Sequence, residues 1–418
     1  MKTTTILLLA TITSALSLSA QTLDDITYSG DTLPGQNYSS YVMNNVTFEN
    51  SDIHDSNFSN ATLNNFTIFV TEDSGLDNLD TERYFANLDF SSSVWTGGKF
   101  SGLTSKSTSS QIYEVFVPVV LKNVNFSGAT LSGVEFSSID SIKGSTNFKG
   151  ANLSGASFYH VNVREADSSL FEDATINGVL FNQVGGLNGK ILEKTGSYKK
   201  GDLSGLLING YASSHTDLSG MDFSGMNLQG MGATFVNLSN ANFTGADLRD
   251  SVSFFTDTSG AIYKNTIMSN GEINNITFNS ESDVLVVRDY KTNAKIAENA
   301  ELSAGSIELL DGAKLEVMDD VTVTISDELS ISFDGEISGV NDILLMGDNS
   351  TIVMAGYESN EEAQAAFIGL FKDSEGNGVD WSPESVASFV TAAIPEPSTY
   401  AAIFGALAIA FAAYRRRK

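Results

Sequence analysis

The sequence predicts an all-β protein whose central part is a coil of very short strands. Large apolar side chains recur at every fifth position through most of residues 43–278. The slots between them hold mainly Ser, Thr, Asn, Asp and Gly, which favour turns and contact with water. Beyond about residue 281 this period gives way to alternating apolar and polar residues, a pattern typical of ordinary strands.

Residues 1–20 have the pattern of a secretory signal peptide. Lys2 supplies a positive start, residues 6–10 open a short apolar segment, and the small residues Ser17, Ser19 and Ala20 offer a cleavage site before Gln21. The alternative, a buried first helix, is disfavoured because polar, strand-forming sequence follows at once. The chain has no cysteine, which excludes disulfides, thiol nucleophiles and lipidated cysteines. The signal-like start at residues 1–20 predicts an exported protein.

Residues 21–280 are predicted to form an interrupted solenoid. Five residues advance about 500° on a helix and so spread around its axis, while on a straight strand a step of five changes face. The apolar slots stay on one side only if the chain bends once per repeat, with residues i and i−2 both pointing inward. Four bends close a square coil of about twenty residues, and coils stack about 4.8 Å apart. The predicted core includes Leu218, Phe223, Leu228, Leu238, Phe243 and Leu248.

The repeats resemble the pentapeptide-repeat family, whose pattern is A(D/N)LXX. Residues 151–155 read ANLSG, residues 241–245 read ANFTG and residues 246–250 read ADLRD. The resemblance implies a right-handed quadrilateral β-helix over residues 43–68, 121–181 and 203–278, with a weaker piece at 85–100.

The sequence also departs from that pattern. Met, Thr or Val often replaces the family's Ala, which would widen the coil. Phase shifts near 137–147 and 164–170 and a break at 185–202 predict loops or kinks. Gaps at 69–84 and 101–120 predict longer excursions.

Residues 281–358 form an acidic, β-rich region, and residues 359–393 a helical cap or linker. Residues 281–391 hold 23 acidic and 5 basic side chains, so 23 − 5 leaves a net charge of −18. The strands would continue a looser solenoid or form a separate sandwich. Helices are expected at 360–372 and 382–393, the second with Ser382 as its cap and Pro383 at its first position. A helix over the open end of a solenoid would protect its strand edge.

Residues 394–418 combine a short motif, an apolar run and a basic end. The apolar run at 400–414 would form a transmembrane helix of about 22 Å, shorter than a hydrocarbon core of about 30 Å. It spans the bilayer only if the flanking cations snorkel and the bilayer thins. The terminal cations should stay cytoplasmic. The motif is Pro395, Glu396 and Pro397, and the membrane stop is Arg415, Arg416, Arg417 and Lys418.

This arrangement resembles the PEP-CTERM sorting signal of Gram-negative bacteria. The resemblance implies a transient membrane anchor that an exosortase-type processing enzyme recognises and cleaves near the tripeptide. Members of that family are often linked to exopolysaccharide or biofilm matrix. A plain C-terminal tail anchor is the alternative.

The sequence shows no nucleophile–base pair, and we expect no enzyme activity, cofactor or metal. The three histidines, His54, His160 and His215, fall at turn slots and should face water. A second hypothesis concerns Arg164, Glu165 and Asp167, which lie in a phase-shift loop where a groove would form. In this hypothesis they are groove residues of a carbohydrate-active β-helix enzyme. The alternative is that they form a surface charge cluster.

Two acidic turns are candidate calcium sites. Asp52 and Asp55, and likewise Asp319 and Asp320, supply the oxygen ligands that Ca²⁺ prefers. The glycine-rich calcium-binding nonapeptide is absent from the sequence, so solvated carboxylates are the simpler interpretation.

The formal net charge of −28 excludes non-specific nucleic-acid binding, which needs cations on phosphates. Pentapeptide-repeat proteins include acidic DNA mimics that inhibit gyrase, but a secretory signal would place this chain in the wrong compartment. The sequence thus predicts an exported, non-enzymatic repeat protein of the cell envelope or extracellular matrix of a Gram-negative bacterium. It would act as a structural or adhesive solenoid, with exopolysaccharide as a candidate partner. The alternatives are the carbohydrate-active enzyme and a self-assembling structural element.

Overall fold

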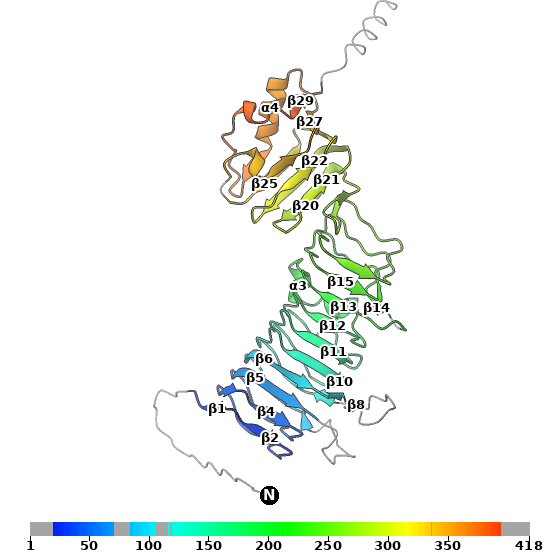
Figure 1. Ribbon diagram of the computed structural model, residues 1–418. Coiled ribbons are helices and arrows are strands. Elements are labelled where there is room, and N and C mark those ends of the chain that lie inside the picture. The colour runs from blue at the N-terminus through cyan, green and yellow to red at the C-terminus, as the bar shows by residue number, and fades with distance from the viewer. Residues whose placement is uncertain are drawn as a thin grey trace, which may run out of the picture.

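The computed structural model describes residues 20–70, 84–104, 116–117, 119–213, 215–335 and 337–393. These residues form two stacks of short parallel strands, one after the other along the chain (Figure 1). The predicted signal segment up to residue 19 and the predicted sorting segment 394–418 lie outside the described residues. Among those that are described, no helix has the length and apolarity needed to cross a membrane.

The first solenoid is organised around a 13-stranded sheet in which every strand pair is parallel. Short pairs outside this sheet are β7–β8, β14–β16 and β18–β19. The sheet contains β1 (Thr22–Asp24), β2 (Thr27–Ser29), β3 (Val42–Asn44), β4 (Thr47–Glu49), β5 (Thr62–Phe69), β6 (Val94–Ser101), β9 (Val119–Lys122), β10 (Glu135–Lys143), β11 (Ser157–Val161), β12 (Leu180–Asn182), β13 (Leu207–Asn209), β15 (Gly232–Thr234) and β17 (Val252–Phe254). The pairs comprise β7 (Leu103–Thr104), β8 (Phe116–Val117), β14 (Thr216–Asp217), β16 (Val236–Asn237), β18 (Thr266–Ile267) and β19 (Ile273–Asn274).

The pairing register shows the predicted four-sided coil. Four positions spaced five residues apart in the first coil each pair in parallel with the residue twenty positions later. These pairs are Thr22 with Val42, Thr27 with Thr47, Thr32 with Asp52, and Asn37 with Asn57. Each side of the square is therefore hydrogen-bonded to the next coil.

Turn chemistry explains the polar slots of the repeat. The Asp or Asn before the central apolar residue accepts a hydrogen bond from the backbone N–H two residues later, as from Ser154 to Asn152 (3.1 Å). The last slot of the repeat takes the left-handed conformation, as at Gly155 (φ 69°) and Asp250 (φ 56°). Gly, Asn and Asp adopt that conformation at the least steric cost, which accounts for their recurrence there.

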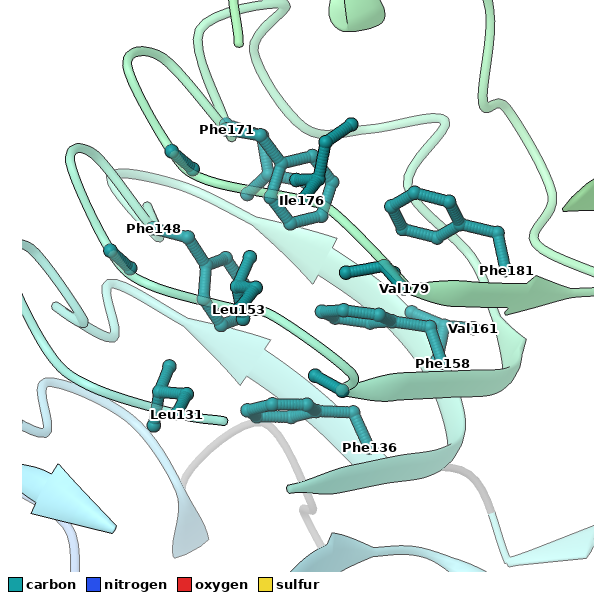
Figure 2. Packing of buried hydrophobic residues seen from close by; sticks show 14 of the residues in the cluster. Leu131, Phe136, Phe148, Leu153, Phe158, Val161, Phe171, Ile176, Val179 and Phe181 are labelled. Atoms are coloured by element: carbon teal, nitrogen blue, oxygen red, sulfur yellow. The ribbon is translucent and has the colours of Figure 1, made fainter. Parts of the chain in front are cut away.

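Inside the coils, aromatic rings stack in columns (Figure 2). Phe126 and Phe148 lie 4.6 Å apart with an interplanar angle of 2°. A second column places Phe158 4.9 Å from Phe136, and the two columns meet edge to face. The longer column joins six coils through Tyr38, Phe58, Phe90, Phe126, Phe148 and Phe171.

The predicted inward residues occupy the core, with one exception. Leu218, Phe223, Leu228, Leu238 and Phe243 are buried. Leu248 is only partly buried, because it lines a cavity of about 150 Å³ at the C-terminal end of the first solenoid. Ser253 and Thr258 line the same cavity and occupy slots that hold larger apolar side chains elsewhere, so they leave this volume unfilled.

The irregular segments keep the core continuous. The break at 185–202 contains two short helices, α2 (Gly189–Leu192) and α3 (Gly196–Lys199). The side chains of Asn188 and Thr195 cap them, and Ile191 and Leu192 remain buried. In the weaker piece, Phe85, Phe90, Trp95 and Phe100 are as deeply buried as the regular repeats.

A second solenoid follows, and its main strand pairs are all parallel. Of the two sequence-based alternatives, the looser solenoid is therefore right and the sandwich is wrong. Its core begins with Ile267, Ile273 and Phe278, so the five-residue count followed to 278 runs too far. Its strands are β20 (Phe278–Arg288), β21 (Ala294–Ile296), β22 (Ala300–Leu310), β23 (Leu315–Val317), β24 (Thr322–Ile325), β25 (Leu329–Phe333), β26 (Leu344–Met346), β27 (Thr351–Met354), β28 (Phe371–Asp373) and β29 (Val390–Ala392).

Helix α4 (Asn360–Gly369) lies against the last strands of this solenoid (Figure 1). Ser359 caps it, and Phe367 packs against Phe371 with ring centroids 5.2 Å apart. The helix predicted at 382–393 is wrong, because only the 3₁₀ turn Pro383–Ser385 forms there. The chain then extends as β29, which pairs with β27 and buries Val390. A second 3₁₀ turn spans Val340–Asp342.

A buried ion pair joins the two solenoids. Arg249 and Asp247 are 1% and 0% exposed, and their side chains meet at 2.6 Å. The same guanidinium donates to the carbonyl oxygens of Thr292 (2.6 Å) and Arg288 (2.7 Å) in the second solenoid. Separating the two solenoids would remove two of the acceptors of this buried guanidinium, and a buried charge without its partners is costly. These contacts therefore hold the second solenoid to the first.

A second junction contact involves Asp283. Its carboxylate accepts hydrogen bonds from the Lys264 ammonium and from the backbone N–H groups of Asn279 (3.0 Å) and Ser280 (3.1 Å). Burial by itself would raise the pKa of Asp283, but these donors hold that pKa below its usual value. The charged carboxylate is thus the form that the junction stabilises.

The stacked core predicts a large effect of truncation at Phe148. Phe148→Ala should destabilise the first solenoid by about 3–5 kcal/mol, because it removes a ring that stacks within one column and contacts the other edge to face. Ser127→Ala, on an outward slot, is the control and should change little. Denaturant unfolding followed by far-UV circular dichroism measures both, and coincident transitions would contradict the inward assignment of Phe148.

The junction predicts a pH dependence with a definite sign. Because the folded pKa of Asp283 is lowered, its contribution is complete above the unfolded carboxyl pKa of about 3.9 and is lost as pH falls through the folded value. Lys264→Gln should therefore lower the unfolding temperature at pH 7, and the difference from wild type should shrink in acid. Lys200→Gln is the exposed control. A difference that stays constant from pH 7 to pH 3 would contradict this role.

Candidate functional site

The outer faces of the first solenoid carry ladders of hydrogen-bonded amides. The Asn44 amide donates to Asp24 (2.6 Å) and accepts from Asn64 (2.7 Å). Parallel ladders start at Asp25, Asp55 and Asp89. Each of these ladders starts at an Asp, whose carboxylate only accepts, and continues through Asn, which both accepts and donates. These faces are polar and already internally bonded.

A polar groove of about 330 Å³ lies on the side of the first solenoid. Its wall is built by successive coils, since Ile139 pairs with Val161 and Asn162 with Gly185. The groove therefore runs from coil to coil along the stack. The polar and aromatic groups that line it are Asp140, His160, Asn162, Arg164 and Tyr211.

Arg164 is held in this groove by its local backbone. Its N–H donates to Asn162 Oδ1 (3.0 Å), the turn bond that recurs through the solenoid. Its side chain lies across Gly185, where an added Cβ would stand 3.1 Å from Nη1. At Gly186 (φ 92°) a Cβ would stand 2.7 Å from the Arg164 backbone nitrogen. The two glycines thus leave the space that the arginine occupies.

The predicted cluster of Arg164, Glu165 and Asp167 is only partly assembled. Arg164 lines the groove, whereas Glu165 and Asp167 do not contribute to its lining. Asp167 instead closes a turn by accepting from the Ser169 N–H (2.8 Å), and this hydrogen bond lowers its pKa. Asp140 and Tyr211 reach the groove from other coils, and no pattern in the sequence predicts their place there.

The three histidines differ in their surroundings. His160 and His215 are exposed, as predicted, and His160 lines the groove. The prediction is wrong for His54, which is partly buried because its ring lies 2.5 Å from the Asp52 carboxylate. The turn position therefore leaves one histidine packed against its neighbour.

The acidic turns are used in hydrogen bonding. Asp319 accepts from the Asp348 N–H (2.8 Å) and Asp320 from the Asn349 amide (3.1 Å). Within the described ranges, no three His, Cys, Asp or Glu side chains gather closely enough to hold a metal ion. The carboxylates at 319 and 320 instead link successive coils.

An exposed aromatic group marks the C-terminal end of the first solenoid. Phe254 and Phe255 are 60% and 74% exposed. The Phe255 ring stacks on Phe235 at 5.1 Å, and Phe235 in turn contacts His215 at 5.9 Å. The column therefore lies on the outside of the coil, where it gives the surface an apolar site of contact.

The comparison with protein families agrees with the coil geometry. A family model described as pentapeptide repeats matches eight copies, over residues 145–167 and 214–250. The chain carries pentapeptide repeats. The matched segments include the ANLSG, ANFTG and ADLRD units and flank the coil that contains α2 and α3. No curated protein matches the chain.

Solved structures of pentapeptide-repeat type are also similar. One is HetL, a pentapeptide repeat protein involved in heterocyst differentiation regulation from the cyanobacterium Nostoc sp. strain PCC 7120. It is 17% identical, with 60% of this chain and 91% of HetL covered and a TM-score of 0.25. Full-length QnrB1, a plasmid-mediated fluoroquinolone resistance protein, is 15% identical, with 56% and 92% covered and a TM-score of 0.17. The assignment of the repeats rests on the family match and the coil geometry.

Proposed function

We propose that this is an exported, non-enzymatic repeat protein that a transient C-terminal membrane anchor delivers to the cell envelope or extracellular matrix. The observation that carries the proposal is the order of segments in the sequence. A signal-like start precedes the solenoids, and Pro395-Glu396-Pro397, an apolar run and a basic end follow them. An exosortase-type enzyme would process that tail.

The architecture supports a structural or adhesive role. The two solenoids form an extended body whose strands hydrogen-bond from coil to coil (Figure 1). Its outer amide ladders are polar, and the exposed rings of Phe254 and Phe255 offer a place for contact with another molecule. A stiff stack with such faces suits a spacer or an adhesive surface.

Removal of residues 394–418 tests the anchor. The truncated chain should leave the membrane fraction and appear in the soluble envelope or the medium, because the apolar run and its basic stop are gone. Replacing Pro395, Glu396 and Pro397 by alanine keeps the run and should instead block release. Membrane retention of the truncated chain would contradict the tail as anchor.

A second candidate function, a carbohydrate-active enzyme, is favoured by one observation. Asp140, His160 and Arg164 line the same groove, and a carboxylate, an imidazole and a cation are groups that acid–base chemistry uses. Incubation of the purified chain with a panel of polysaccharides tests this function. Reducing ends or unsaturated products would overturn the non-enzymatic proposal.

A further inference from the structure

We propose that the groove lined by Asp140, His160, Arg164 and Tyr211 binds an acidic saccharide chain. The Arg164 guanidinium would hold a sugar carboxylate, and the Tyr211 ring would lie against the face of a neighbouring sugar. This inference deepens the proposed adhesive function and rests on it for the encounter with such a polymer. The binding itself is a property of the groove.

Charge points to an anionic ligand. Cations are few in this acidic chain, whose formal net charge is −28, and some of those in the first solenoid are paired, as Lys149 is with Glu172 (2.8 Å) and Lys199 with Asp173 (2.7 Å). Among the residues that the structure describes, the Arg164 guanidinium has no ion-pair partner. A guanidinium presents a planar fork of donors that matches a carboxylate in a bidentate pair.

The Arg164 side chain is preorganised for binding. The Asn162 side chain fixes its backbone, and the absence of a side chain at Gly185 lets the guanidinium lie over that rung. Holding the cation in place in this way lowers the entropic cost of binding. The glycine is therefore part of the site although it offers the ligand no polar side chain.

The course of the groove favours a linear ligand. Its lining comes from the coils of β10, β11, β12 and β13, which follow one another in the sheet at about 4.8 Å per strand. The volume of about 330 Å³ lies at the lower end of the usual range for small-molecule sites, about 300–1,000 Å³. A chain laid along the stack would meet a new set of side chains at each coil.

The remaining groups suit hydroxyls and a sugar ring. The amide nitrogen of Asn162 donates and the Asp140 carboxylate accepts, so together they match hydroxyl groups. Asp140 would repel a ligand carboxylate and would therefore direct it toward Arg164. Tyr211 adds an amphipathic ring, apolar on its face and polar at its tip. Phosphate or sulfate alone would use the guanidinium but not these other groups.

The experiment measures the affinity of the purified full-length chain for trigalacturonate by isothermal titration calorimetry, with the neutral galactose trisaccharide as reference. Trigalacturonate should bind more tightly than the neutral sugar. Arg164→Gln should weaken binding by about tenfold or more, because a charge-assisted bidentate pair is lost. Arg164→Lys should retain part of the affinity. Lys149→Gln, a matched loss of charge away from the groove, should leave it unchanged.

Two further variants separate a saccharide site from a simple anion site. Tyr211→Ala and Gly185→Ala should each weaken trigalacturonate binding while thermal unfolding stays near wild type. Equal binding of the neutral sugar, or an unchanged affinity in Arg164→Gln, would overturn the proposal. If inorganic phosphate binds as well as trigalacturonate and Tyr211→Ala has no effect, the site is an anion site only and the saccharide proposal fails. Membrane fractionation of the 394–418 deletion tests the proposed export separately.

Discussion

The whole architecture depends on stacking one coil on the next at the spacing of hydrogen-bonded strands. At that spacing, side chains at equivalent positions come into contact whatever their distance in sequence. Phe126 and Phe148 are 22 residues apart in the chain and lie 4.6 Å apart as parallel rings. Outside the coil the same constraint places Asn44 above Asp24 and joins them. A single geometric repeat thus orders both the apolar interior and the polar surface.

The same constraint explains how the solenoid tolerates irregular segments and what they produce. An insertion is accommodated if the chain leaves the coil and returns in register, as between Leu63 and its partner Trp95, 32 residues later. Where a coil is lengthened instead, the outer face changes shape. Strand β10 is nine residues long in a stack where three is common, and its register with β9 shifts between Ile139 and Ser141. The groove lies beside that irregularity.

The residue patterns predict the core residues and the coil correctly. They fail where contacts between distant segments decide the local structure. The five-residue period identifies Phe223 and Phe243 as inward because one bend per repeat is the only geometry that keeps them together. Alternation at 321–325 is equally compatible with parallel and antiparallel pairing, so it left open the solenoid and the sandwich. At 382–393 a sound helix start was overridden by the pairing of β29 with β27.

The groove was only half visible in the sequence for a related reason. Arg164 stood out because it interrupts the repeat, but Asp140 and Tyr211 sit 24 residues before it and 47 after it. The lengths of the intervening coils and insertions decide that these side chains meet on one face of the stack. To predict a site assembled across coils, the pairing register of the strands must be known as well as the five-residue repeat.

Part of the acidity of the second solenoid serves its turns. Asp342 accepts from the Ser338 hydroxyl and from the Ser338 and Gly339 N–H groups, and Asp373 accepts from the Asn377 side-chain amide and from two N–H groups of its own turn. These hydrogen bonds lower the pKa of both carboxyls, so the charged form is the one that closes the turn. A net charge of −18 in that region is compatible with a compact stack because part of it is stabilised by backbone donors.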